Sequence, residues 1–287
     1  MTLAIGAKYP WGSLHKFAVF QGDLPQAIIF VTDSRWTRDN PNNQNDFEDV
    51  GTKLFGLTTE AAMVYAGDVI SGEHCIKEFG RKLQKIRRRS FRVNLYIAQQ
   101  TFQETYKYHR LSRKTKVFPL YFLIGVCDKA GRASLIYLSS PKFKPLYLEG
   151  MHGIGEREAL RDLENAVNQE IDKGVKEEFD LRFRYPVEDA PHRLDEKYAM
   201  KVAMWIGIAM REQVIDSTAY PTVGGPLQIA IIEKTGITTP EVRWTKDVDD
   251  WHSATAQSDE TTTYQDKYKL GPAFISSSSF GLYRISD

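Results

Sequence analysis

The chain has 287 residues, of which 42% are hydrophobic, so it can bury a sizeable core in one large domain or two small ones. Its 38 basic and 37 acidic residues leave a formal net charge of +1, which disfavours nucleic acid or a membrane surface as a partner. Two cysteines, Cys75 and Cys127, do not make a disulfide framework and indicate small, largely buried thiols in a reducing compartment.

The sequence lacks the usual signals for secretion, membrane insertion and cofactor binding. The first fifteen residues have no basic start or continuous apolar stretch, and the longest apolar run, 202–210, is too short for a membrane span. The six histidines show no metal-ligand spacing, and glycine-rich phosphate-loop motifs are missing. We therefore expect a cytoplasmic, soluble protein without a metal or another cofactor.

The N-terminal half predicts strands separated by two long polar segments. The apolar, β-rich runs lie at 2–8, 27–32, 53–58 and 61–66. Residues 10–26 contain two prolines and two glycines and predict a long hairpin or loop. The asparagine-rich stretch 38–51 predicts an exposed loop.

Helical periodicity then predicts two antiparallel helices over one side of a sheet, at 69–86 and 93–111. The later elements are, in chain order, strands at 117–126, 133–138 and 144–148, helices at 156–173 and 195–215, and a strand at 226–233. The 195–215 helix is apolar on nearly all sides and should be buried. The charged stretch 174–193 contains two prolines, so we expect it to be irregular.

This order of elements predicts an α+β fold with antiparallel sheets covered by helices. We expect one domain over residues 1–240. Residues 241–287 then form a C-terminal extension to which the sequence assigns no structure.

Thr2 is the first candidate for chemistry because it stands directly behind Met1. If Met1 is removed, Thr2 gains a free α-amine whose ordinary pKa is about 8. Its hydroxyl can then attack an electrophile while the amine accepts the proton. The same dipeptide is also an ordinary chain start, so the hypothesis depends on the residues further along.

Two later segments supply the groups that such a threonine needs. The 27–32 strand is followed by Asp33 and Arg35, and Lys53 opens the next apolar run. An ammonium close to the hydroxyl favours its ionised form, and a carboxylate keeps that ammonium charged and oriented. The 61–66 strand leads into Gly67 and Asp68 before a helical pattern.

In this order the motifs resemble the proteasome β-type N-terminal nucleophile hydrolases, including their simpler bacterial relatives. The resemblance covers roughly residues 2–235. The residues similar to the family's motifs are Thr2 with Gly6, Asp33 with Arg35 and Thr37, Lys53-Leu54-Phe55, Ala66-Gly67-Asp68, Gly125 to Asp128, Gly153-Ile154-Gly155, Leu194-Asp195-Glu196 and Gly224-Gly225.

The resemblance implies a four-layer α-β-β-α sandwich with two antiparallel sheets. It also implies a site in which Thr2 is the nucleophile, Lys53 favours its alkoxide and Asp33 orients Lys53. Arg35 would brace the loop that carries Asp33. The backbone N–H at Val64 would hold the oxyanion, and Asp216 would assist the terminal amine.

Three positions depart from the family pattern. Val64 stands where the family usually has glycine, and Ile154 stands where a serine assists the amine. The assisting aspartate aligns with Tyr220 without a gap, or with Asp216 if the loop is four residues longer. We prefer Asp216, because it ends the helix as the family pattern does.

The resemblance implies an N-terminal threonine hydrolase of peptide or amide bonds. It implies a homo-oligomeric ring or a related assembly, with peptide or protein substrates, and leaves room for an ATPase unfoldase as a partner. The departures motivate an alternative, a non-catalytic scaffold or binding subunit. A basic cluster in 81–92 is read as a charged helix end rather than as a nucleic-acid contact.

Overall fold

The computed structural model describes residues 3–12, 14, 26–38, 46–48, 53–84, 91–113, 117–184, 196–217, 219–225 and 227–239. The expected C-terminal extension 241–287, most of the expected loop 10–26 and the arginine triplet 87–89 lie outside the described residues.

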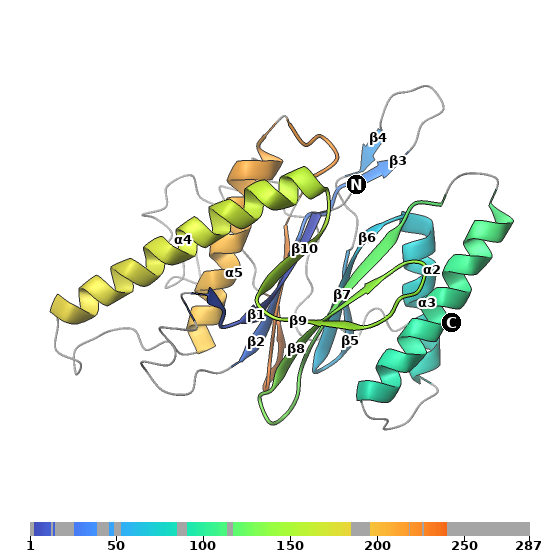
Figure 1. Cartoon of the computed structure of the whole chain (residues 1–287), viewed down its shortest axis with the longest axis horizontal. Coiled ribbons are helices and arrows are strands. Elements are labelled where there is room, and N and C mark those ends of the chain that lie inside the picture. The colour runs from blue at the N-terminus through green and yellow to red at the C-terminus, as the bar shows by residue number, and fades with distance from the viewer. Residues whose placement is uncertain are drawn as a thin grey trace, which may run out of the picture.

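Two five-stranded antiparallel sheets form the centre of the molecule (Figure 1). The first sheet has the order β10 (Met151–Gly155), β1 (Leu3–Tyr9), β2 (Ala27–Thr32), β11 (Gln228–Glu233) and β12 (Gly236–Thr238). The second has the order β5 (Leu54–Thr58), β6 (Ala61–Gly67), β7 (Leu120–Cys127), β8 (Ala133–Ser139) and β9 (Leu146–Leu148). The predicted α+β class with two antiparallel sheets is therefore confirmed.

The apolar character of both faces of the inner strands follows from their position. In β2, Ile29 and Val31 face the helices, whereas Ile28 and Phe30 face the second sheet. A strand that is buried on both sides needs a continuous apolar run rather than an alternating one. This explains why the sequence of β2 is apolar at every position from Ala27 to Val31.

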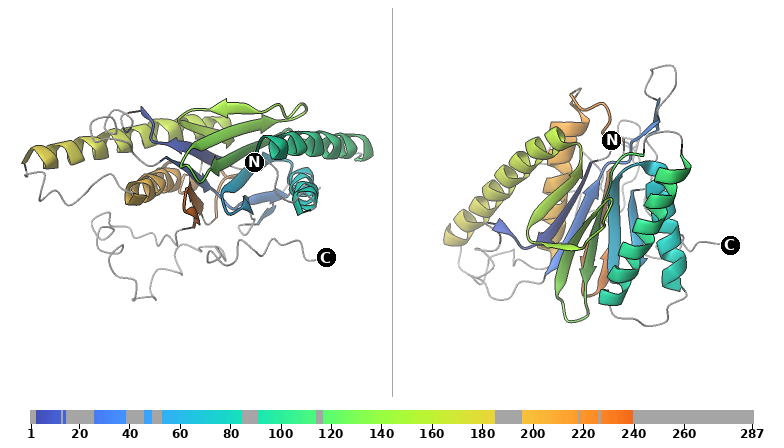
Figure 2. Two further views of the ribbon diagram at one scale, coloured as in Figure 1. Left: turned by 90° about the horizontal axis from the view of Figure 1, so that it is seen from below. Right: turned by 45° about the vertical axis from the view of Figure 1, so that its right-hand side comes forward.

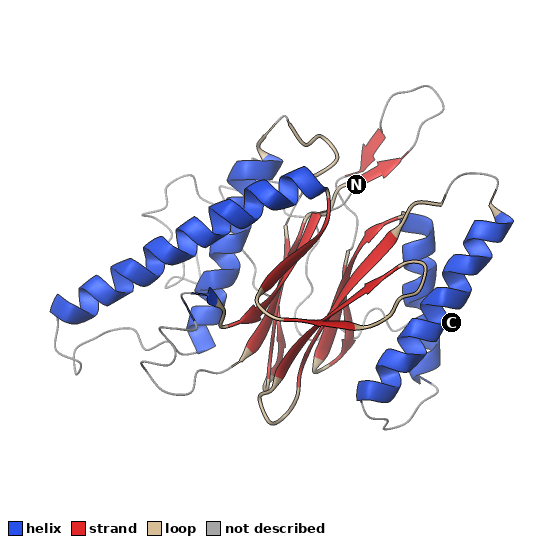
Figure 3. Cartoon of the chain, viewed as in Figure 1, coloured by secondary structure: helices blue, strands red, loops and turns tan. Residues whose placement is uncertain are grey.

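Helices cover the outer face of each sheet (Figure 3). Helices α4 (Arg157–Arg184) and α5 (Glu196–Met210) pack on the first sheet, and a short π-helical turn, Arg211–Ile215, continues α5. Helices α2 (Val69–Gln84) and α3 (Phe91–Ser112) pack on the second sheet. The two helix pairs stay on opposite sides of the sheets in all views (Figure 2).

The expectation for residues 174–193 is wrong over its first part, because α4 continues to Arg184. Residues 174–184 belong to this helix although many of them are charged, and no proline occurs between Arg157 and Pro186. A run of charged residues is therefore a poor signal for the end of a helix.

Two further expectations also need correction. Gly153-Ile154-Gly155, which by the resemblance should form a glycine turn, belongs to the edge strand β10, which pairs with β1. A Cβ at Gly153 would lie 1.9 Å from Leu160 Cδ2, so this glycine allows α4 to pack closely on the strand. Within the expected loop 38–51, residues Asp46–Glu48 form strand β4, which pairs with β3 (Trp36–Arg38).

The second helix pair is fastened at one end by Asp68, which caps α2. Its Oδ1 accepts hydrogen bonds from the Ser71 backbone N–H at 2.9 Å, the Ser71 hydroxyl at 2.7 Å and Arg113 Nη1 at 2.7 Å. Burial raises the pKa of Asp68, but the hydrogen bonds from Ser71 and the charge of Arg113 outweigh it and lower the pKa below its ordinary value. The ionised carboxylate therefore joins the start of α2 to the end of α3.

Among the residues that the structure describes, no helix has both the length and the apolar character that a membrane crossing requires.

The turn between β6 and α2 depends on Gly67, and a matched pair of substitutions tests this. Gly67 has φ +116° and a Cβ there would lie 1.9 Å from the Pro119 carbonyl oxygen, whereas Gly131 has φ +78° and its nearest neighbour would be Lys234 Cδ at 3.9 Å. Gly131→Ala should cost only the conformational strain, about 1 kcal/mol. Gly67→Ala must also displace backbone and should cost more than about 3 kcal/mol in urea unfolding. Equal losses would contradict this account.

Candidate active site

A buried ion pair joins the two sheets at one end of the molecule. Lys53 Nζ lies 2.9 Å from Asp33 Oδ1, and the two side chains are 1% and 0% exposed. Asp33 follows β2 of the first sheet, and Lys53 precedes β5 of the second. The expected partners Asp33 and Lys53 therefore meet where the sheets face each other, although 20 residues separate them in the chain.

Asp33 accepts four hydrogen bonds, two on each carboxylate oxygen. Oδ1 accepts from Lys53 Nζ and from the Leu3 backbone N–H, both at 2.9 Å. Oδ2 accepts from the backbone N–H groups of Arg35 at 3.2 Å and Gly224 at 3.1 Å. A carboxylate offers about four acceptor positions. Asp33 is therefore an anchor for its neighbours rather than a base that could take up a substrate proton.

The amino end of β1 enters this cluster. The Leu3 carbonyl accepts hydrogen bonds from the Asp33 N–H at 3.1 Å and the Thr32 hydroxyl at 3.0 Å, while the Leu3 N–H donates to Asp33. Both polar groups of the Leu3 backbone are thus fixed on the segment that carries Asp33. Thr2, the expected nucleophile, lies outside the described residues.

Arg35 clamps the loop that precedes β11. Its Nη1 donates to the Pro221 carbonyl at 2.9 Å, and its own backbone N–H also lies 3.0 Å from the Gly224 carbonyl. A Cβ at Gly224 would lie 2.4 Å from Arg35 Cζ, so only glycine leaves room for the guanidinium. The Arg35 carbonyl accepts a second hydrogen bond from Lys53 Nζ. Arg35 therefore contacts the ion pair through its backbone and the 220–224 loop through its side chain.

Gln228 is a member of the site that sequence reasoning did not identify. Its Oε1 accepts the backbone N–H groups of Lys53 at 3.0 Å and Leu54 at 3.2 Å, and the residue is 5% exposed. Gln228 lies at the first position of β11, opposite Thr32 in the register. A polar residue directly before the apolar run 229–232 was the only signal available for it.

Val64 and Asp216 do not join the ion pair. Val64 is paired with Leu54 on one side and Leu123 on the other, and its side chain lies in the apolar layer between the sheets. Because the Leu54 N–H points away from β6 towards Gln228, this pair is not hydrogen-bonded and the Val64 N–H faces β7.

Asp216 follows the π-helical turn after α5. Its carboxylate lies 3.3 Å from Arg211 Nε, and its N–H donates to the Arg211 carbonyl. Ile154, at the position where the family has a serine, is buried between the sheets. Ile154 thus has no hydroxyl to assist a terminal amine, and the Asp216 carboxylate pairs with Arg211.

Other kinds of site are weakly supported. No group of three or more His, Cys, Asp or Glu side chains within the described ranges is arranged to hold a metal ion. Burial raises the pKa of the Cys75 thiol, and burial together with nearby carboxylates raises that of Cys127 to about 11. Both thiols are therefore poor nucleophiles at neutral pH.

Comparison of the sequence with models of known protein families found no matching family, and comparison with curated proteins found no match.

The ion pair should make Lys53 far more sensitive to substitution than a lysine in a surface pair. Lys53→Met leaves the Asp33 charge buried without its partner and should cost about 3–5 kcal/mol of unfolding free energy. Lys8→Met is the control, because Lys8 makes a 2.7 Å pair with Glu149, whose side chain is 80% exposed. That change should cost about 1 kcal/mol or less. Denaturant unfolding measures both, and similar losses would argue against the buried pair.

Gln228 should act through the two amides that it holds. Gln228→Leu leaves the N–H groups of Lys53 and Leu54 without their acceptor, at about 1–3 kcal/mol for each buried donor. Hydrogen exchange followed by mass spectrometry should show faster exchange at the start of β5. Gln99→Leu, which removes an exposed hydrogen bond to the Lys142 carbonyl, is the control and should leave β5 unchanged. Unaltered exchange in Gln228→Leu would exclude this role.

Proposed function

We propose that the chain is an N-terminal threonine hydrolase of peptide or amide bonds, related to the proteasome β-type N-terminal nucleophile hydrolases, with Thr2 exposed by removal of Met1. The observation that supports this most is the position of the Lys53–Asp33 pair. It lies at the first residue of β1, next in the chain to the proposed nucleophile. The layered arrangement of helix pair, sheet, sheet and helix pair agrees with the four-layer sandwich of that family.

Covalent geometry favours contact between Thr2 and Lys53. The Leu3 nitrogen and Lys53 Nζ both lie 2.9 Å from the same oxygen of Asp33, so they are separated by at most twice that distance. The Cα of Thr2 is two covalent bonds from the Leu3 nitrogen. The ammonium of Lys53 therefore lies close to the point at which Thr2 joins Leu3.

The proposed reaction assigns one role to each group. Thr2 Oγ attacks the carbonyl carbon of the substrate, and its proton passes to the Thr2 α-amine, directly or through a water. Lys53 stabilises the negative charge on Oγ, and Asp33 holds Lys53 in place. The amine then returns the proton to the leaving nitrogen, and water hydrolyses the acyl-enzyme.

The backbone N–H of Gly67 is a better candidate for the oxyanion donor than the backbone N–H of Val64. The Val64 N–H faces β7, and N–H groups alternate in direction along a strand, so the Gly67 N–H turns to the side of β5. Gly67 lies beyond the first residue of β5, Leu54, on the side of Lys53. We therefore assign the oxyanion donor to Gly67 and leave Asp216, which pairs with Arg211, outside the mechanism.

A non-catalytic scaffold or binding subunit on the same fold is the second candidate. The apolar Ile154 and the separate pairing of Asp216 favour it, because both leave the terminal amine without the expected assistance. In either case we propose a homo-oligomer with a sequestered chamber. For the hydrolase, peptides or proteins are the substrates, and the proposal leaves room for an ATPase unfoldase as a partner.

Substitution of the nucleophile separates the two candidates. Thr2→Ala should lower hydrolysis of a fluorogenic peptide library by more than about a thousandfold, because no other group replaces the hydroxyl. Thr2→Ser keeps a hydroxyl and should retain measurable activity. Intact mass spectrometry should find the chain without Met1 and with one adduct after treatment with a β-lactone, whose ring opens to an ester of the Thr2 hydroxyl. A chain that keeps Met1 and takes no adduct would support the scaffold.

A further inference from the structure

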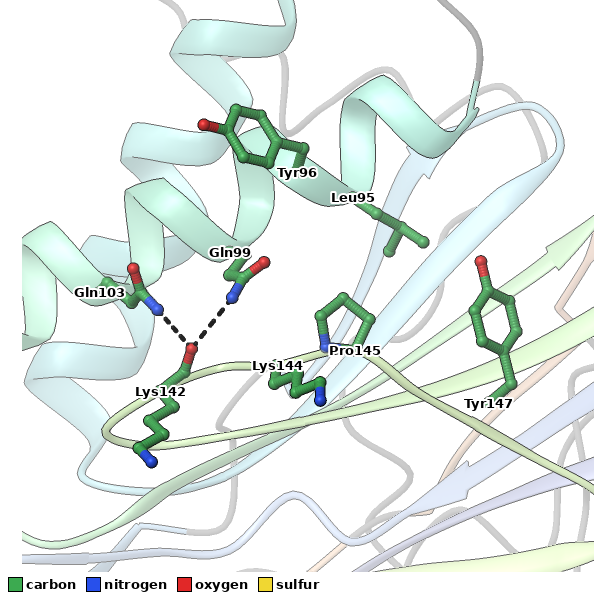
Figure 4. Close-up of a pocket in the computed structure, with 8 residues that line it drawn as sticks. All are labelled: Leu95, Tyr96, Gln99, Gln103, Lys142, Lys144, Pro145 and Tyr147. Atoms are coloured by element: carbon green, nitrogen blue, oxygen red, sulfur yellow. Dashed lines mark hydrogen bonds between the residues drawn. The ribbon is translucent and has the colours of Figure 1, made fainter.

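A groove lies between α3 and the segment that leads into β9, far along the chain from the residues of the ion pair (Figure 4). Its volume is about 580 Å³. One wall is formed by α3 and the other by the β8–β9 connection and β9. The lining residues are Leu95, Tyr96, Gln99, Gln103, Lys142, Lys144, Pro145 and Tyr147.

The two walls are fixed to each other. The side-chain amides of Gln99 and Gln103 on α3 both donate to the Lys142 carbonyl, as the dashed lines in Figure 4 mark. Phe143, the next residue, is fully buried and packs edge-on against Phe102 and Tyr106 of α3. The groove is therefore formed before any partner arrives, which lowers the entropic cost of binding.

The backbone of Phe143 has a strained conformation that helps to maintain the shape of the groove. Its φ is +45°, a conformation that costs an aromatic residue about 1–3 kcal/mol and persists only where packing requires it. With Phe143 turned inward, the neighbouring residues Lys142 and Lys144 are exposed. The connection thus anchors itself in the core and presents two cations at the rim of the groove.

Apolar and backbone groups are also exposed along this groove. Tyr96 is 58% exposed, and Leu146 and Tyr147 of β9 are each 56% exposed. Strand β9 is the last strand of its sheet and pairs, within the described residues, only with β8. The outer edge of such a strand offers N–H and C=O groups to an added strand.

The charge of the groove indicates the chemistry of its occupant. Neither Lys142 nor Lys144 forms an ion pair with a carboxylate of the described residues, although Lys8, Lys82 and Lys129 do. The nearby Glu149 is paired with Lys8. The groove therefore combines two exposed cations, two tyrosine rings and a strand edge.

We propose that this groove binds an extended acidic segment of a partner protein. An aromatic or branched apolar side chain of the segment packs against Leu95, Pro145 and Tyr147, and flanking Asp or Glu residues pair with Lys142 and Lys144. The segment runs beside β9 and shares its backbone hydrogen bonds. A polynucleotide could meet the lysines but could not pair with a strand edge, so a peptide is the occupant that uses every feature.

Selection from a phage-displayed library of random nonapeptides on the full chain tests the proposal. Enriched peptides should carry Asp or Glu beside an aromatic or branched apolar residue. By fluorescence anisotropy, the Lys142→Glu and Lys144→Glu double variant should bind these peptides at least about tenfold more weakly, because two attractive contacts become repulsive. Tyr147→Ala should also weaken binding, and added salt should weaken it in the unmodified chain.

Lys129→Glu is the matched control, because Lys129 is an 89% exposed lysine in the turn between β7 and β8. It should leave peptide affinity unchanged, and circular dichroism should find all variants folded. The proposal would be overturned by a selection without acidic enrichment, or by peptides that bind the double variant as well as the unmodified chain. It would also be overturned if the unmodified chain self-associates in sedimentation, or binds oligothymidylate, and only the double variant loses that property.

Discussion

The structure around the candidate site depends on one buried ion pair, Lys53 with Asp33, which lies where the two sheets meet. Each charge loses several kcal/mol of hydration on burial, and attraction between the charges offsets this only when hydrogen bonding is complete. Asp33 meets that condition with four donors that come from β1, the segment after β2, the segment before β5 and the loop before β11. The sandwich is what brings these distant segments to one point.

Most of this cluster is made of backbone rather than side chains. Three of the four donors to Asp33 are the N–H groups of Leu3, Arg35 and Gly224, and Gln228 in turn holds two backbone N–H groups. Few side-chain identities are therefore required, provided that the fold is kept. A cluster of this kind can therefore be encoded by a small number of short motifs in a fixed order along the chain.

The strands and helices could largely be predicted from the sequence, because apolar runs and helical periodicity report burial directly. The end of α4 could not be predicted, because charged residues are common both in loops and on helices. Strand β10 was obscured by Gly153, which allows α4 to pack closely on the strand. In the candidate site, the needs of an N-terminal threonine and the family resemblance implied that Asp33 orients Lys53. Gln228 and the direction of the Val64 N–H depend on strand register, which a single sequence does not contain.

The same ion pair bears on the choice between hydrolase and scaffold. Replacing a buried ion pair by apolar residues of similar volume is often neutral or stabilising, so a scaffold would gain little from keeping one. An ammonium fixed at the first residue of β1 is useful when negative charge develops on the residue before it. The energetic cost of burying Lys53 and Asp33 beside Leu3 therefore favours the proposed chemistry at Thr2. In that proposal Asp216, which pairs with Arg211, bears on how the Thr2 amine is tuned rather than on whether the nucleophile can be activated.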